Sequence, residues 1–153
     1  MRSTLTFLCF LILNLATLYL DTLLMNGGPT SEWYENLDRA PWEPAGWIFG
    51  AAWTCVMVFF SVYLTFLYQN IKTHKVWGLF VIHFVLNVSW NYIFMNKHMI
   101  ELGLLNITLL SALMFYFLFA FKEVLSQMRF FVLPYCLWLV LASSLNIYVV
   151  IYN

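Results

Sequence analysis

The chain has 153 residues and no net charge, because seven Lys and Arg balance seven Asp and Glu. Hydrophobic residues make up 63% of it and charged residues only 9%, whereas a typical soluble domain carries about 25% charged residues. The polar surface is therefore too small for a water-exposed globule. The sequence also has no basic patch, which excludes nucleic acid as a partner.

Five stretches of at least 18 residues contain no charged residue. A helix needs about 20 apolar residues to span a bilayer, and only helices or closed barrels can do so. The stretches are continuously apolar rather than alternating, which favours helices over a barrel. The sequence thus predicts an all-α integral membrane protein, a five-transmembrane-helix bundle in a single domain, residues 1–153. The expected helices cover about residues 4–25, 44–70, 76–95, 100–122 and 130–152.

The first apolar stretch also has features of a signal peptide. However, no small-x-small cleavage site follows it, and its apolar run exceeds the usual length of about 7–15 residues. We therefore interpret it as the first membrane helix and expect a bacterial membrane as the location. Basic residues then gather on the side of the N-terminus, which predicts a cytoplasmic N-terminus. That side would carry Arg2, Lys72, Lys75, Lys122 and Arg129, and the other side Arg39 and Lys97.

The junction between the first two helices is unusually rich in tryptophan. The stretch "WYENLDRAPWEPAGWIFGAAW", residues 33–53, holds four of the seven tryptophans. An aromatic belt at the membrane surface accounts for one or two of them, but not for Trp53, which lies beyond the boundary. Pro44 is expected in the first turn of the second helix, where proline is tolerated. We expect residues 26–43 to form a loop that covers a pocket.

Polar side chains follow one face of the predicted third helix. His83, Asn87, Trp90 and Asn91 stand at i, i+4, i+7 and i+8, which places them on the same side. Such groups avoid lipid. The spacing is compatible with two interpretations, hydrogen bonds between helices or the wall of a ligand pocket.

The second and fifth helices add aromatic and small residues. Trp138, Ala142, Leu145 and Asn146 share one face of the fifth helix, where the small Ala142 leaves room beside a deep tryptophan. In the second helix, Gly46 and Gly50 form a G-x-x-x-G pattern that indicates a close helix contact, within one chain or between two. Flat aromatic walls with a few polar donors suit a large planar apolar ligand.

Other chemistry finds little support in the sequence. It contains no catalytic triad and no glycine-rich phosphate loop, and its histidines are too scattered to predict a metal site. The three cysteines lie far apart in apolar segments and are expected to pack there. Asp21, near the end of the first helix, is expected at the membrane interface.

Three motifs, taken together, resemble the translocator protein / tryptophan-rich sensory protein (TspO) family. The stretch "WYENLDRAPWEPAGWIFGAAW" is similar to its W-Y-x-x-L-x-(K/R)-P-x-W signature and the W-x-(F/L)-G-P-x-W that follows. "LNVSWNYIF" resembles its third-helix segment, and "LPYCLWLVLASSLN" its fifth-helix segment. The resemblance extends from about Trp33 onward.

The resemblance implies a five-helix bundle, commonly a homodimer, that binds porphyrins such as protoporphyrin IX and requires no cofactor. By motif position, the implied pocket residues are Trp53, Asn87, Trp90, Trp138, Ala142 and Leu145, with Tyr34 and Phe49 beside them. His83 and Asn91 join this set through their helix face. Some bacterial members are reported to degrade porphyrin in light, which would give Trp53 and Trp138 a catalytic role.

The sequence departs from the family pattern where animal members bind cholesterol. After Tyr148 come the residues "VVIYN", which contain no basic side chain, so cholesterol is not expected as the ligand. Three functions remain. The first is a membrane receptor that senses tetrapyrroles and regulates their level or a stress response. The second is a light- and oxygen-dependent porphyrin-degrading enzyme, and the third a transporter of tetrapyrroles or small metabolites.

Overall fold

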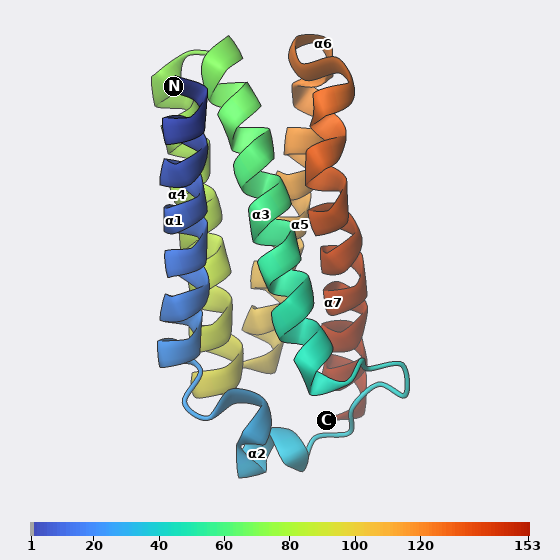
Figure 1. Cartoon of the computed structure of the whole chain (residues 1–153). Coiled ribbons are helices and arrows are strands. Elements are labelled where there is room, and N and C mark those ends of the chain that lie inside the picture. The colour runs from blue at the N-terminus through green and yellow to red at the C-terminus, as the bar shows by residue number, and fades with distance from the viewer. Residues whose placement is uncertain (1) are drawn as a thin grey trace.

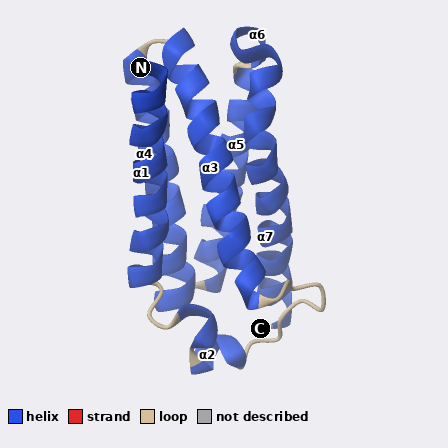
Figure 2. Cartoon of the chain, in the orientation of Figure 1, coloured by secondary structure: helices blue, strands red, loops and turns tan. Residues whose placement is uncertain are grey.

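The computed structural model describes residues 2–153, and their side chains from residue 3 onward. Its long helices confirm the predicted all-α fold, and the described residues contain no strand (Figures 1 and 2). Five segments are long and apolar enough to cross a membrane. The single-domain assignment stays a prediction, and Met1 lies outside the described residues. The long helices are α1 Arg2–Leu24, α3 Gly46–Asn70, α4 Thr73–Asn91, α5 Ile100–Ala120 and α7 Leu133–Tyr152.

The five long helices form a closed bundle. Helix α1 packs on α3 and α4, α5 packs on α4 and α7, and α7 returns to α3. Figure 1 shows the N-terminus at the same end as the α3–α4 turn and the short helix α6, Lys122–Leu125. The opposite end carries the short helix α2, Glu32–Glu35, and the C-terminus.

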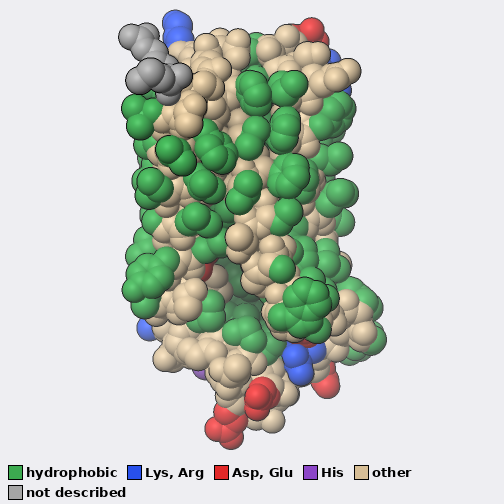
Figure 3. Space-filling model, viewed as in Figure 1, with side chains coloured by type: hydrophobic (Ala, Val, Ile, Leu, Met, Phe, Trp, Pro, Cys, Tyr) green, Lys and Arg blue, Asp and Glu red, His purple; other side chains and the backbone are tan. Residues whose placement is uncertain are grey.

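The outer surface of the bundle is apolar on every long helix. In the view of Figure 3, hydrophobic side chains cover the shaft and charged side chains gather at the two ends. A soluble protein rarely exposes so large an apolar surface, whereas lipid is the natural neighbour of such a surface. Examples of these exposed side chains are Leu5, Ile12, Val81, Leu105, Phe119, Leu137 and Ile151.

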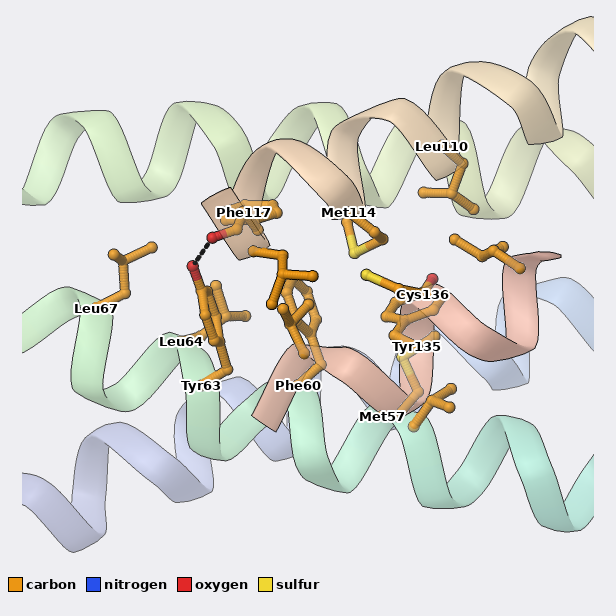
Figure 4. Close-up of a cluster of buried hydrophobic side chains, with 14 of the residues drawn as sticks. Met57, Phe60, Tyr63, Leu64, Leu67, Leu110, Met114, Phe117, Tyr135 and Cys136 are labelled. Atoms are coloured by element: carbon orange, nitrogen blue, oxygen red, sulfur yellow. Dashed lines mark hydrogen bonds between the residues drawn. The ribbon is translucent and has the colours of Figure 1, made fainter. Parts of the chain in front are cut away.

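The tightest packing lies in the half of the bundle away from α2. Large side chains of α3, α5 and α7 interlock there, and Figure 4 shows Phe60, Met114 and Tyr135 among them. The Tyr63 hydroxyl donates a hydrogen bond of 2.6 Å to the carbonyl oxygen of Phe117, which joins α3 to α5. This packed half leaves the other half of the bundle free to hold a cavity.

The segment between α1 and α3 is more ordered than the expected loop of residues 26–43. It contains a 3₁₀ turn, Gly28–Thr30, and helix α2, whose first turn is capped by the Ser31 side chain. Helix α3 begins at Gly46 rather than at residue 44, because Ala45 has an extended backbone. Pro44 therefore precedes the helix, which corrects the expected first-turn position. We call residues 26–45 the lid.

Other helix ends also differ from the sequence-based boundaries. Helix α4 begins at Thr73 and passes into a π turn at Tyr92–Asn96, where the widened backbone takes up one extra residue per turn. Helix α5 ends at Ala120 instead of residue 122. A 3₁₀ segment, Ser126–Val132, precedes α7, so α7 begins at Leu133 instead of residue 130. Pro134 consequently lies in the first turn, where its missing N–H costs little.

Candidate ligand-binding site

A cavity of about 1050 Å³ lies between the helices under the lid. Its wall comes from α1, α3, α4 and α7 and its cover from the lid, so it occupies the half of the bundle that the core leaves open. Figure 3 shows the molecule hollowed on the face of α1 and α3, close to the lid. The volume is at the upper end of the range typical of small-molecule sites, about 300–1,000 Å³.

Three aromatic rings build one wall of the cavity. The centroids of the Trp53 and Trp138 rings lie 6.2 Å apart at an interplanar angle of 83°. Phe49 meets Trp138 edge to face at 5.5 Å. These edge-to-face contacts fix the orientation of the rings. The wall is therefore rigid and apolar before any ligand arrives.

Helix α7 adds a donor and free space to this wall. The buried indole nitrogen of Trp138 has no hydrogen-bond partner among the described residues. Ala142 and Leu145 lie on the same face and also line the cavity. A buried donor without a partner is costly, and this nitrogen has too little accessible surface for a ligand in the cavity to reach it unless the ring shifts.

Helix α4 supplies the opposite wall. The Trp90 indole nitrogen donates to the side-chain oxygen of Asn146 at 3.3 Å, which ties α4 to α7. The Trp90 ring stacks on Phe94, with centroids 5.1 Å apart. Asn91 also lines the cavity. The π turn that follows Asn91 carries Phe94 toward the cavity wall.

The lid closes the cavity with polar side chains. The Tyr34 hydroxyl donates to a carboxylate oxygen of Glu43 at 2.8 Å, and Arg39 reaches the same oxygen at 3.3 Å. Burial, and then the hydrogen bond to Glu43, raise the pKa of Tyr34 above its ordinary value. Tyr34 is therefore a neutral donor at physiological pH, and this contact stays intact throughout the neutral range.

Tryptophans fasten both ends of the lid. Trp33 stacks on His98, with ring centroids 4.1 Å apart. The Trp42 indole nitrogen donates to the Ser144 hydroxyl at 3.1 Å. Trp47, by contrast, is 76% exposed at the membrane boundary, as an aromatic belt requires. The four clustered tryptophans thus serve three purposes, since two hold the lid, Trp53 forms the cavity wall and Trp47 faces outward.

The C-terminal residue also holds the lid. The Asn153 side chain accepts a hydrogen bond of 2.9 Å from the backbone N–H of Asp38 and donates one of 3.2 Å to its carbonyl oxygen. No pattern in the sequence indicates Asn153, His98 or Ser144 as lid partners. Their distance along the chain from the lid leaves no local signal for these contacts.

Replacing Tyr34 with phenylalanine should loosen the lid. The change removes the hydrogen bond to Glu43 and leaves the ring in place, so we expect a bound ligand to dissociate about threefold to tenfold faster, as for the loss of one ordinary hydrogen bond. Stopped-flow displacement of a bound porphyrin would measure the dissociation rate. Tyr19→Phe, on the exposed surface of α1, is the matched control, and an equal effect of both changes would contradict the role of Tyr34.

Two residues of the predicted polar stripe do not reach the cavity wall. His83 and Asn87 are buried deeper in the bundle, where both hydrogen-bond to the hydroxyl of Tyr135 from α7. This placement corrects their assignment as pocket residues. The stripe runs through both halves of the bundle, so its deep end joins helices and its lid end, Trp90 and Asn91, lines the cavity.

Two further expectations need correction. A Cβ added at Gly46 or Gly50 would meet no atom within 4 Å, so these glycines line the cavity and make no close helix contact within this chain. A close helix contact between two chains stays a prediction. Asp21 was expected at the interface, but it is only 6% exposed and lines the cavity as well. Among the described residues, no three His, Cys, Asp or Glu side chains gather in a metal-binding group.

Comparison with known proteins agrees with this architecture. The model of the TspO/MBR family matches residues 7–152. The tryptophan-rich protein TspO of Chlorobaculum tepidum is 30% identical over 122 residues, which cover 77% of each chain. Protein CrtK of Rhodobacter capsulatus is 28% identical over 74% of each chain. The tryptophan-rich sensory protein of Cereibacter sphaeroides is 23% identical over 84% of this chain and 87% of its own.

The family match extends over nearly all of the described chain, from α1 to the end of α7. It includes the lid, both tryptophans of the aromatic wall and all five apolar helices. This chain is an integral membrane protein and belongs to the TspO/MBR family.

Proposed function

We propose that this chain is a membrane receptor that binds protoporphyrin IX or a related tetrapyrrole in the cavity under the lid. The observation that carries the proposal is the wall of Phe49, Trp53 and Trp138, which offers flat apolar surface in a cavity of about 1050 Å³. Large conjugated rings bind to such surfaces through stacking and burial. By binding, the receptor would regulate the tetrapyrrole level or a stress response.

The polar groups around the cavity support the binding of a tetrapyrrole with acidic side chains. Arg39 lines the cavity at the lid. A propionate near Arg39 would gain a charge-assisted hydrogen bond. The ring would then lie in the apolar half of the cavity and its acids near the lid.

Saturable binding tests this function. We expect the tryptophan fluorescence of the detergent-purified chain to fall in proportion to occupancy when protoporphyrin IX is added in the dark at micromolar concentration. A water-soluble anionic dye without a planar macrocycle serves as the control ligand. Linear, unsaturable quenching at all concentrations would show that the porphyrin partitions into the micelle, and the proposed function would be wrong.

The contact between Trp53 and Trp138 favours a second candidate function. A photoexcited porphyrin held against these indoles can pass its excitation energy to dioxygen, and the singlet oxygen formed can add across a carbon–carbon double bond of the porphyrin, which is thereby oxidised. This chemistry would make the chain a light- and oxygen-dependent porphyrin-degrading enzyme in which Trp53 and Trp138 are catalytic. Loss of porphyrin absorbance under light and oxygen, but not in the dark or under argon, would support it. Loss that persists in the Trp53→Phe and Trp138→Phe variants would oppose it.

The proposal extends to the orientation of the receptor in the membrane and to its assembly. We infer a bacterial membrane with a cytoplasmic N-terminus. Lys72, Lys75, Lys122 and Arg129 support this orientation, because they lie at the end of the bundle opposite the lid, whereas Arg39 and Lys97 lie at the lid end. The lid would then face outward from the cytoplasm. We also propose a homodimer in the bilayer, with no cofactor and no role for cholesterol.

A further inference from the structure

Asp21 is an acidic residue in an unfavourable place. It lies in the last turn of α1, where the partial negative charge of the helix end disfavours another negative group. It lies within an apolar membrane-spanning segment and is only 6% exposed. Acidic residues inside membrane segments are expensive and usually serve a ligand or a proton.

The described residues leave this carboxyl group partly unsatisfied. Its Oδ1 atom is buried and has no hydrogen-bond partner among them, while the Asn91 side chain lies beside it. Of the basic side chains described, only Arg39 lines the cavity, and it is paired with Glu43 at 3.3 Å. Asp21 therefore places a carboxyl group in the cavity wall, and no described basic side chain forms a salt bridge with it.

An acceptor in the wall selects ligands by the position of their donors. The N–H groups of a closed porphyrin point to the centre of the ring, where a side chain at the ring edge cannot reach them. A linear tetrapyrrole is not closed, so a side chain can approach its lactam and pyrrole N–H groups through the gap between its two ends. The peripheral acids of either ligand would be attracted toward Arg39 at the lid.

The geometry points to Asp21, with Asn91 beside it, as an acceptor site for N–H donors of the bound ligand, so that the cavity favours a linear tetrapyrrole over a closed porphyrin ring. This inference rests on the proposed function, because both use the same cavity. It adds a specificity determinant outside the aromatic wall.

Biliverdin and protoporphyrin IX are suitable probes, because both carry two propionates on a conjugated tetrapyrrole and differ in whether a side chain can approach their N–H groups. Each would be titrated in the dark against the full-length chain and the Asp21→Leu and Asp21→Asn variants. We expect Asp21→Leu to weaken biliverdin binding about tenfold or more, as for one hydrogen bond to a charged group. Protoporphyrin IX binding should change by less than about threefold, and Asp21→Asn, which keeps an acceptor oxygen, should lie between.

Thermal unfolding separates a binding role from a structural one. If Asp21 is held for a ligand, Asp21→Leu should raise the unfolding temperature of the ligand-free chain, because it removes a buried acceptor without a partner. Glu123→Gln, whose side chain is 88% exposed at the far end of the bundle, is the matched acid-to-amide control. It should change neither binding nor stability.

Each other outcome has a distinct meaning. If Asp21→Leu lowers the affinity for both ligands equally, or lowers the unfolding temperature, then Asp21 has a structural role and the inference is wrong. Binding of protoporphyrin IX without binding of biliverdin would also overturn it, and the proposed function would stand. Failure of both ligands to bind saturably would reject the proposed function and the inference together.

Discussion

Replacing Trp138 with alanine is expected to weaken protoporphyrin IX binding about thirtyfold, the effect of losing one central aromatic anchor. The ring of Trp138 is buried between Phe49 and Trp53, and it contacts both edge to face. Without the Trp138 ring, the cavity loses one flat wall, and Trp53 loses the edge-to-face contact that orients its ring. Quenching titrations in the dark, on protein of matched purity, would measure the affinity.

Two comparisons make this result specific. Trp138→Phe keeps a flat ring at the same position and should lose only a few-fold in affinity. Trp47→Ala removes an exposed tryptophan that does not line the cavity and should leave the affinity unchanged. Equal losses for Trp47→Ala and Trp138→Ala would show that quenching reports the surface of the protein, and the cavity would not be the binding site.

Replacing Tyr135 with phenylalanine is expected to lower the free energy of unfolding by about 2 kcal/mol. The Tyr135 hydroxyl is the shared partner of His83 and Asn87 in the middle of the bundle. Its removal leaves two buried polar groups of α4 without this partner. Denaturation of the detergent-solubilised chain, followed by circular dichroism, would measure the change.

The same substitution separates stability from binding. Tyr135 lies outside the cavity wall, so the affinity of folded Tyr135→Phe protein for porphyrin should stay within about twofold of the original. Tyr116→Phe, at an exposed tyrosine of α5, is the control and should change neither quantity. A variant that kept its full stability but lost porphyrin binding would show that the hydroxyl acts on the ligand rather than on the bundle.

These two results would map the division of the bundle along its axis. The half away from the lid is filled by interlocking side chains of α3, α5 and α7. The lid half holds the cavity and two polar atoms that lack hydrogen-bond partners among the described residues, one carboxyl oxygen of Asp21 and the indole nitrogen of Trp138. Polar groups that are costly to bury thus lie in the lid half, while the tightly packed half away from the lid supplies the stability of the bundle.

The amino-acid sequence by itself determined the five helices and much of the site. Stretches of at least 18 residues without charge leave the backbone no alternative to a helix in lipid. The motifs around Trp53, Trp90 and Trp138 identified the family and the aromatic residues that line the cavity. Helical spacing also placed His83 and Asn91 on one face correctly.

Only the tertiary structure decided how deep each residue of that face lies and what it meets. Helical periodicity defines a direction around the axis and contains no information on the distance from the lid, so His83 and Asn87 could not be separated from Trp90 by spacing. The contacts of the lid with His98, Ser144 and Asn153 join distant parts of the chain. Asp21 lines the cavity because the lid and α4 enclose the end of α1. The sequence of α1 alone does not indicate which residues surround Asp21.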